Sequence, residues 1–200
     1  MPAYFSVEFH YTKKDIGNIS EIYNALLACG LRFKSGYYES ENDSWDDIIA
    51  WNQNKLDDDF ELGYEEHYIH DYKQVLFDFY DFSEVRLFIL NVHGADEISF
   101  YLIIPEDDLI GTVNLCDTML QADKMKLLEQ LAIDMWRHGG ICSIQTGWEG
   151  SKCGISMDEI INGIEPIVEP FAIVPRHFYR EAWGLGKREI EGDGVFLYSK

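Results

Sequence analysis

Hydrophobic and polar residues alternate at the start of the chain. Over residues 3–11, Phe5, Val7, Phe9 and Tyr11 fall on one face of an extended segment, and mostly polar residues fall on the other. A period of two is typical of a β-strand that is buried on one side. Apolar and aromatic runs predict further strands at 31–39, 74–79, 85–92, 98–104, 141–147, 171–174, 188–191 and 195–198.

Apolar residues at helical spacing indicate helices between several of these strands. Residues that can cap a helix stand before these apolar stretches, and glycine or proline stands after them. Ser156 and Glu159 match the capping box, in which each side chain satisfies a backbone N–H of the other residue. The predicted helices begin after Asp15, after Ser44, at Gln121 and after Ser156, and Pro105 with the acids 106–108 indicates another first helical turn.

The order of these elements predicts an α+β fold. Strands follow one another directly at 74–104 and again at 171–198, which is typical of antiparallel pairing. We expect a mixed or largely antiparallel sheet with three to four helices packed mainly on one face. The length suits a single domain over residues 1–200, with a minor subdivision near 139–156 as the alternative.

The negative charge of the chain is concentrated in one segment. Of a formal net charge of −20, residues 41–110 supply −16, because 19 carboxylates there are opposed only by Lys55, Lys73 and Arg86. Aromatic residues are interleaved with these acids, which indicates a folded segment and not a free acidic tail. Charges are screened beyond about 8 Å at physiological ionic strength. Crowded carboxylates therefore create a local field that dispersed carboxylates do not.

The composition argues against several classes of protein. A net-negative chain is repelled by nucleic-acid phosphate and by anionic membrane surfaces. No basic region precedes an apolar stretch near Met1, and the cysteines form no Cys-x-x-Cys pair, as expected for reduced thiols. We therefore expect a cytoplasmic protein that binds neither nucleic acid directly nor membranes, and its oligomeric state stays open.

The densest part of the acidic segment is the predicted partner surface. A patch of acids and aromatic side chains steers a cationic protein to encounter and supplies packed anchors for it. The sequence thus favours a non-enzymatic binding or inhibitor protein, without a cofactor, that neutralises a basic protein partner. The residues predicted to contact this partner are Asp57, Asp58, Asp59, Glu61, Tyr64, Glu65, Glu66 and Tyr68.

In general character the chain resembles the bacterial immunity proteins that block cationic toxins. The resemblance lies in small size, acidity and reduced cysteines, and no sequence motif carries it. It implies a basic, toxin-like partner. A nucleic-acid mimic that inhibits a nucleic-acid-binding protein is the close variant. Regularly spaced carboxylates along one face would favour the mimic, and a compact patch of acids and aromatic residues would favour the toxin inhibitor.

A metal-dependent hydrolase is the alternative from a different class. His67 and His70 would share one face of a helix, Asp71 could add a carboxylate, and His93 could arrive through the fold. A metal held there would lower the pKa of a bound water. No other ligand follows at a recognisable spacing, so the pair by itself is a weak motif.

The remaining histidines do not point to another kind of catalysis. His10, His138 and His177 lie near the ends of predicted elements. The sequence contains neither a Gly-x-Ser-x-Gly elbow nor a nucleotide-binding loop to accompany them. We therefore assign these three histidines no catalytic role.

Overall fold

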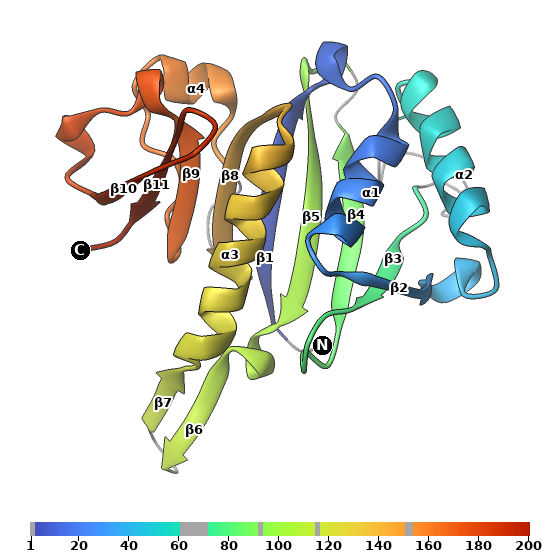
Figure 1. Ribbon diagram of the computed structural model, residues 1–200, viewed down its shortest axis with the longest axis horizontal. Coiled ribbons are helices and arrows are strands. Elements are labelled where there is room, and N and C mark those ends of the chain that lie inside the picture. Colours follow the sequence, from blue (N-terminus) through green and yellow to red (C-terminus); the bar gives the residue numbers. More distant parts are fainter. Residues whose placement is uncertain (1–2, 61–71, 92–93, 115–116, 151–153) are drawn as a thin grey trace.

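We describe a computed structural model of the chain, which places residues 3–60, 72–91, 94–114, 117–150 and 154–200 (Figure 1). For residues 112–119 only the path of the backbone is described. The elements in chain order are β1 (Tyr4–Thr12), α1 (Ile19–Ala28), β2 (Arg32–Gly36), α2 (Trp45–Asp57), β3 (Val75–Asp78), β4 (Val85–Asn91), β5 (Glu97–Pro105), β6 (Ile110–Asn114), β7 (Asp117–Leu120), α3 (Ala122–His138), β8 (Ile141–Trp148), α4 (Met157–Ile161), β9 (Phe171–Pro175), β10 (Gly186–Ile190) and β11 (Gly194–Tyr198).

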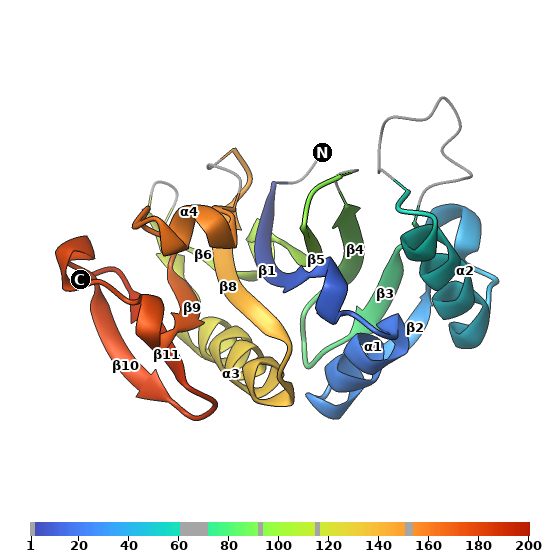
Figure 2. The ribbon, with the colours of Figure 1, turned by 90° about the horizontal axis from the view of Figure 1, so that it is seen from above.

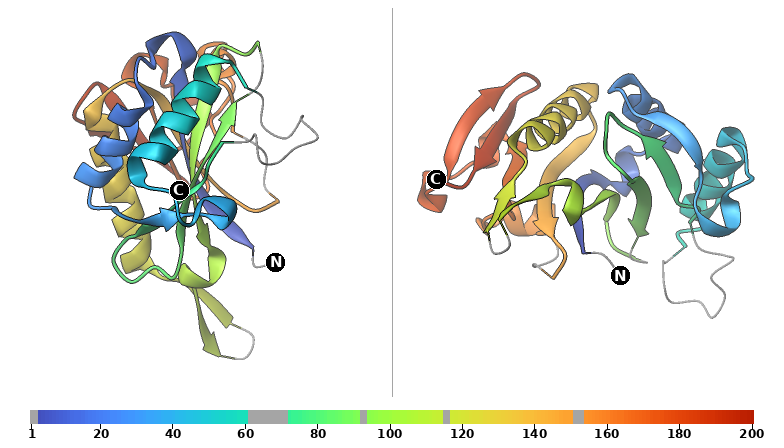
Figure 3. Two further views of the ribbon diagram at one scale, coloured as in Figure 1. Left: turned by 90° about the vertical axis from the view of Figure 1, so that its right-hand side faces the viewer. Right: turned by 90° about the horizontal axis from the view of Figure 1, so that it is seen from below.

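Nine strands of the described residues form one sheet, in the order β10-β11-β9-β8-β1-β5-β4-β3-β2. Every neighbouring pair of these strands is antiparallel, and β1 lies in the middle between β5 and β8. The remaining strands, β6 and β7, pair only with each other and extend away from the body as a hairpin (Figures 1 and 3). The prediction of an α+β fold with a largely antiparallel sheet is confirmed.

The helices lie mainly on one face of the sheet (Figure 2). Helices α1 and α3 cover this face, and α2 packs beside α1 near β2, whereas the short α4 lies on the opposite face. The main core, with Phe5, Phe9 and Phe100 fully buried, lies under α1 and α3. A smaller core on the opposite face joins Met157 and Ile160 of α4 to β9 and β11. Among the described residues, no helix is long and apolar enough to cross a membrane.

The local helix signals in the sequence work as predicted at α2, α3 and α4. Ser44 caps α2, since its hydroxyl accepts a hydrogen bond from Asp47 N at 3.2 Å. Ser156 and Glu159 form both hydrogen bonds of the capping box at α4. Helix α3 buries the apolar stripe that its spacing predicts.

The first helix begins later than predicted. Residues 13–15 form a single 3-10 turn, and α1 starts at Ile19. Asn18 is its cap, because the side-chain oxygen of Asn18 accepts a hydrogen bond from Ser20 N at 2.9 Å. Asp15 is instead held by the hydroxyl of Thr12. Both residues can cap a helix, and the sequence by itself does not rank them.

The turn after Pro105 is also shorter than predicted. Residues 106–108 form one 3-10 turn, and the chain then continues into the β6–β7 hairpin, which was not expected. Leu109 is fully buried, and its carbonyl accepts a hydrogen bond from Gln121 N at 2.7 Å. This contact closes the base of the hairpin.

Candidate functional site

The structure describes three of the residues predicted to contact the partner. Asp57 and Asp58, at the end of α2, are exposed, and Asp59 is half-buried. The predicted contacts Glu61, Tyr64, Glu65, Glu66 and Tyr68 lie outside the described residues, as do His67, His70, Asp71 and His93 of the alternative metal site. Within the part of the chain that is described, no group of three or more His, Cys, Asp or Glu side chains could hold a metal ion.

Asp59 binds groups of its own chain. Its carboxylate accepts hydrogen bonds from Lys13 Nζ at 2.5 Å, from Asn91 Nδ2 at 3.2 Å and from Gly94 N at 3.3 Å. The Lys13 hydrogen bond is the largest of the effects that lower the pKa of Asp59 to about 2. Asp59 thus fastens the chain after α2 to the end of β1 and to the β4–β5 turn.

Exposed carboxylates lie near these contacts of Asp59. The segment after β1 reaches the β4–β5 turn, where Lys13 N donates to Asp96 O at 2.8 Å. Gln53 of α2 accepts a hydrogen bond from Ile19 N of α1 at 2.8 Å and donates one to Asp57 at 2.8 Å. We call the five exposed carboxylates at this end of the sheet the acidic edge: Asp15, Glu21, Asp57, Asp58 and Asp96.

Other acids of the segment 41–110 lie at the opposite end of the sheet. There Ser83 N donates to Asp108 at 2.7 Å, and Lys124 lies 3.8 Å from Asp81 and 3.6 Å from Asp108. Tyr80 projects from the same turn with 71 % of its side chain exposed. Consecutive turns of an antiparallel sheet alternate between its two ends. Acids that are close in sequence are therefore divided between separate surfaces.

The described tryptophans of the acidic segment have different environments. Trp45 belongs to the core, with its ring 5.0 Å from Phe33 and 5.3 Å from Tyr23. Trp51 is half-buried on α2, and Lys73 lies 4.5 Å and Lys55 5.5 Å from its ring centre. These cation–π contacts place positive charge beside Trp51. Both tryptophans are half-buried.

A buried polar cluster lies on the sheet face that carries α4. Glu8 and His10 of β1 are only 6 % and 5 % exposed. His10 Nδ1 lies 2.9 Å from Ser99 Oγ, and His10 Nε2 lies 3.5 Å from Glu8 Oε2. Glu8 Oε1 accepts a hydrogen bond from Ser6 at 3.0 Å, whereas Glu8 Oε2 has no hydrogen-bond partner among the described residues.

The segment 154–168 covers this cluster. Gln145 of β8 holds the cover, because its side chain bonds both backbone groups of Ile155, at 3.0 and 2.6 Å, and Ile167 N at 2.9 Å. Gly154 packs so closely that a Cβ there would lie 2.6 Å from Glu8 Oε2. The alternating pattern of β1 places Glu8 on its polar face, and this cover is the reason that the polar face is buried.

The cluster connects a serine, a histidine and a carboxylate, which are the residue types of a catalytic triad. Ser99, however, lies in the middle of β5, and its backbone is paired with β1 on one side and with β4 on the other. Its backbone N–H is therefore not available to stabilise an oxyanion, which acyl transfer requires. We interpret the cluster as the attachment of the cover.

No protein-family model matches the chain, and no curated protein matches it in sequence. Its function is therefore inferred from its own residues and their arrangement.

Proposed function

We propose that this protein is a non-enzymatic binding protein that neutralises a basic protein partner through an acidic surface. The acidic edge carries the proposal. Its five carboxylates are exposed, and none of them forms an ion pair with a described residue. Lys13, which lies two residues before Asp15, is bonded to Asp59.

The physical reason is electrostatic steering. Unpaired carboxylates within a Debye length of one another add their potentials, and such a field raises the association rate of an oppositely charged protein by roughly 10- to 1,000-fold. Charge at the rim of an interface affects the association rate more than the affinity, so the affinity requires apolar contacts as well. Tyr64 and Tyr68 stay the predicted anchors.

Within this class, we favour an inhibitor of the toxin-immunity type that acts in the cytoplasm. The described acids support it over a nucleic-acid mimic, since the acidic edge and the acids around Asp108 lie at opposite ends of the sheet. The immunity-type partner would be a cationic toxin. No observation among the described residues favours the metal-dependent hydrolase.

The proposal is tested by capturing the partner and measuring its association. The full chain is used as bait in a lysate of the source cells, and the captured protein is purified. We expect a basic protein whose association rate falls as salt rises from about 0.01 M to about 1 M, because the Debye length falls from about 30 Å to about 3 Å. A partner that binds at the same rate throughout this series refutes electrostatic steering.

Charge reversal locates the surface. The double variant Asp57→Lys/Asp58→Lys should lower the association rate at low salt by roughly tenfold or more. The matched control Asp81→Lys/Asp107→Lys makes the same charge change at the opposite end of the sheet, and it should lower the rate by less than about threefold. If the control has the larger effect, the acidic edge is not the partner surface.

A further inference from the structure

Strand β10 forms an unpaired edge of the nine-stranded sheet. It stands last in the strand order and pairs only with β11 among the described strands. Figure 2 shows it at the outside of the sheet, with no α-helix along its free edge. An edge strand presents a row of unpaired backbone N–H and C=O groups, which is a template for a further strand.

The charges along β10 complement a second copy of the same strand. Its exposed residues are Lys187, Arg188 and Glu189. Charged side chains on an edge strand usually prevent pairing, but here both signs are present. The antiparallel alignment of two β10 strands that pairs all five residues has its centre at Arg188. Lys187 then lies opposite Glu189 of the second copy, and the twofold axis repeats this pair.

The central arginines do not oppose this alignment directly. The guanidinium carbon of Arg188 lies 4.6 Å from the ring centre of Phe196, which is opposite Arg188 on β11. The charge is therefore directed inward over the sheet and away from the free edge. Lys187 and Glu189 project from the other face of the strand, where they form exposed ion pairs with Glu181 and Arg176. Exposed pairs of this kind are weak, so they can be exchanged for pairs with a second copy.

The other edge of the sheet lacks this complementarity. Strand β2 carries the exposed bases Arg32 and Lys34 and contains no acidic residue. Full antiparallel overlap of two β2 strands would place Lys34 opposite Lys34 of the second copy, without a pair of opposite charge. Like charges directly opposite one another destabilise strand pairing. Of the two edges, β10 therefore fits a second copy and β2 does not.

The net charge around β10 also permits two copies to approach. Residues 171–200, which contain β9, β10 and β11, carry five basic and four acidic residues, a net charge of +1. Since the whole chain carries −20, residues 1–170 carry −21. Two copies that meet at β10 thus bring together the parts of the chain that have no excess of negative charge.

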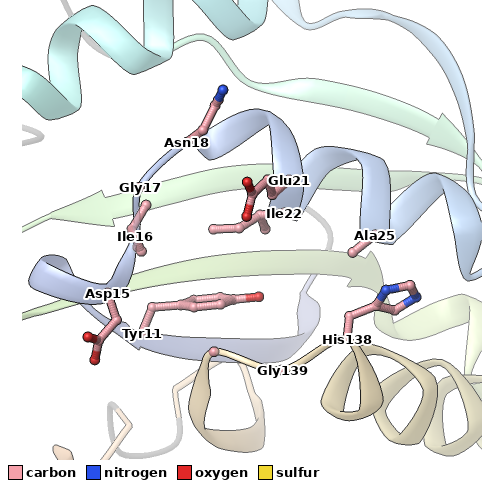
Figure 4. Close-up of a pocket in the computed structure, with 11 residues that line it drawn as sticks. Tyr11, Asp15, Ile16, Gly17, Asn18, Glu21, Ile22, Ala25, His138 and Gly139 are labelled. Carbon is pink, nitrogen blue, oxygen red and sulfur yellow. The ribbon is translucent and has the colours of Figure 1, made fainter.

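The acidic edge, in contrast, is unsuited to a second copy. Its five exposed carboxylates would meet five like charges. A pocket of about 290 Å³ lies beside it between α1 and α3, with Tyr11 and His138 among its lining residues. Among the described residues no lysine or arginine lines this pocket, and the carboxylate of Asp15 points away from its interior (Figure 4). The pocket therefore offers no lysine or arginine to receive the acids of a second copy.

We propose that β10 pairs antiparallel with β10 of a second copy across a twofold axis centred on Arg188, which joins two nine-stranded sheets into one. Four strands separate β10 from β5, so the dimer leaves the Asp96 turn of the acidic edge free on both copies. The inference goes beyond the proposed function and does not depend on it. Because five residues per copy form a small interface, we expect a dissociation constant of roughly 10–100 µM.

Sedimentation velocity of the full chain at concentrations from about 1 to about 500 µM tests this pairing. We expect the mass to rise from one chain to two and no further. Lys187→Glu places like charges opposite one another twice per dimer and should weaken association by roughly tenfold. The matched control Lys34→Glu makes the same charge change on β2 and should change the dissociation constant by less than about threefold.

The charge swap Lys187→Glu/Glu189→Lys provides the decisive variant. It exchanges the two signs and restores opposite charges across the twofold axis, so association should return to within about threefold of wild type. Circular dichroism and thermal unfolding of each variant show whether the fold is retained, and the swap keeps the inference testable even if Lys187→Glu is less stable.

Three results would overturn the inference. The first is a wild-type chain that stays monomeric up to the highest concentration. The second is growth beyond the dimer, which would mean head-to-tail association and not twofold pairing. The third is a charge swap that associates no better than Lys187→Glu. None of these results bears on the capture of a basic partner, so the two proposals fail separately.

Discussion

Replacing Asn52 by alanine should loosen α2 from the sheet. Asn52 is fully buried, and its side-chain amide donates to Tyr23 Oη at 2.8 Å and to Lys73 O at 2.8 Å. Its side-chain oxygen accepts a hydrogen bond from Lys73 N at 2.6 Å. One side chain thus joins α2 to α1 and to the segment that leads into β3. Helix α2 also carries Asp57 of the acidic edge, and Asp58 follows it directly, so its attachment positions that surface.

The expected loss follows from the groups left without partners. Alanine removes three hydrogen bonds and strands the Tyr23 hydroxyl, which is 1 % exposed, together with two half-buried backbone groups of Lys73. A buried polar group without a partner costs about 1–3 kcal/mol, and the half-buried groups cost less because water can reach them. We expect Asn52→Ala to lower the free energy of unfolding by about 3 kcal/mol. For a chain of this length that lowers Tm by roughly 10 °C.

Urea unfolding followed by tryptophan fluorescence measures this change. Asn54→Ala is the matched control, since Asn54 is exposed on the same helix, and it should change the free energy of unfolding by less than about 0.5 kcal/mol. Combining Asn52→Ala with Tyr23→Phe removes the stranded hydroxyl, so the double variant should lose less than the sum of the single variants. A loss below about 1 kcal/mol for Asn52→Ala, or strict additivity in the double variant, would refute the reasoning.

Two further substitutions test the attachments of the site. Asp59→Asn removes the ion pair with Lys13, in which the two atoms are 2.5 Å apart. The pKa of Asp59 in the folded chain is about 2, below the ordinary value of 3.8. The contribution of the ion pair to the free energy of unfolding is therefore complete above about pH 4 and is lost as the pH falls towards 2. The Asp59 side chain is 36 % exposed, so we expect only about 1 kcal/mol at pH 7, and thermal unfolding from pH 7 to pH 2 should show the difference between wild type and variant closing. Gly154→Ala places a Cβ 2.6 Å from Glu8 Oε2 and should destabilise the fold by about 1–3 kcal/mol, whereas Gly17→Ala, where a Cβ meets nothing within 4 Å, should be neutral. A stability difference between wild type and Asp59→Asn that stays the same from pH 7 to pH 2 would contradict the first expectation. Equal stability of the two glycine variants would contradict the second.

The local parts of the fold could be predicted because their causes are local. The alternation in β1 and the capping box at Ser156 depend on residues within a few positions of one another. Where two local signals compete, prediction is weaker, and α1 shows this. Asp15 and Asn18 can both cap a helix, and the contact of Ile19 N with Gln53, which is distant in sequence, favours the later start.

Asn52 shows what the apolar spacing of α2 leaves undetermined. It lies four residues after Ile48 and four before Leu56, on the stripe that the helix buries. A polar residue on such a stripe is stable only if partners exist, and these come from Tyr23 and Lys73. The sequence pattern indicates the burial of Asn52, but its partners become visible only in the folded chain.

The sequence by itself determined the kinds of elements, the largely antiparallel α+β class and the excess of negative charge, because period, capping and composition act over short distances. The tertiary structure decided which residues meet. It divided the acids of 41–110 between opposite ends of the sheet and brought Asp15 and Glu21 to the edge with Asp57. It also placed Tyr11 and His138 in one pocket. The physical reason is that strand order and helix packing are set by burial summed over the whole chain, which no local pattern encodes.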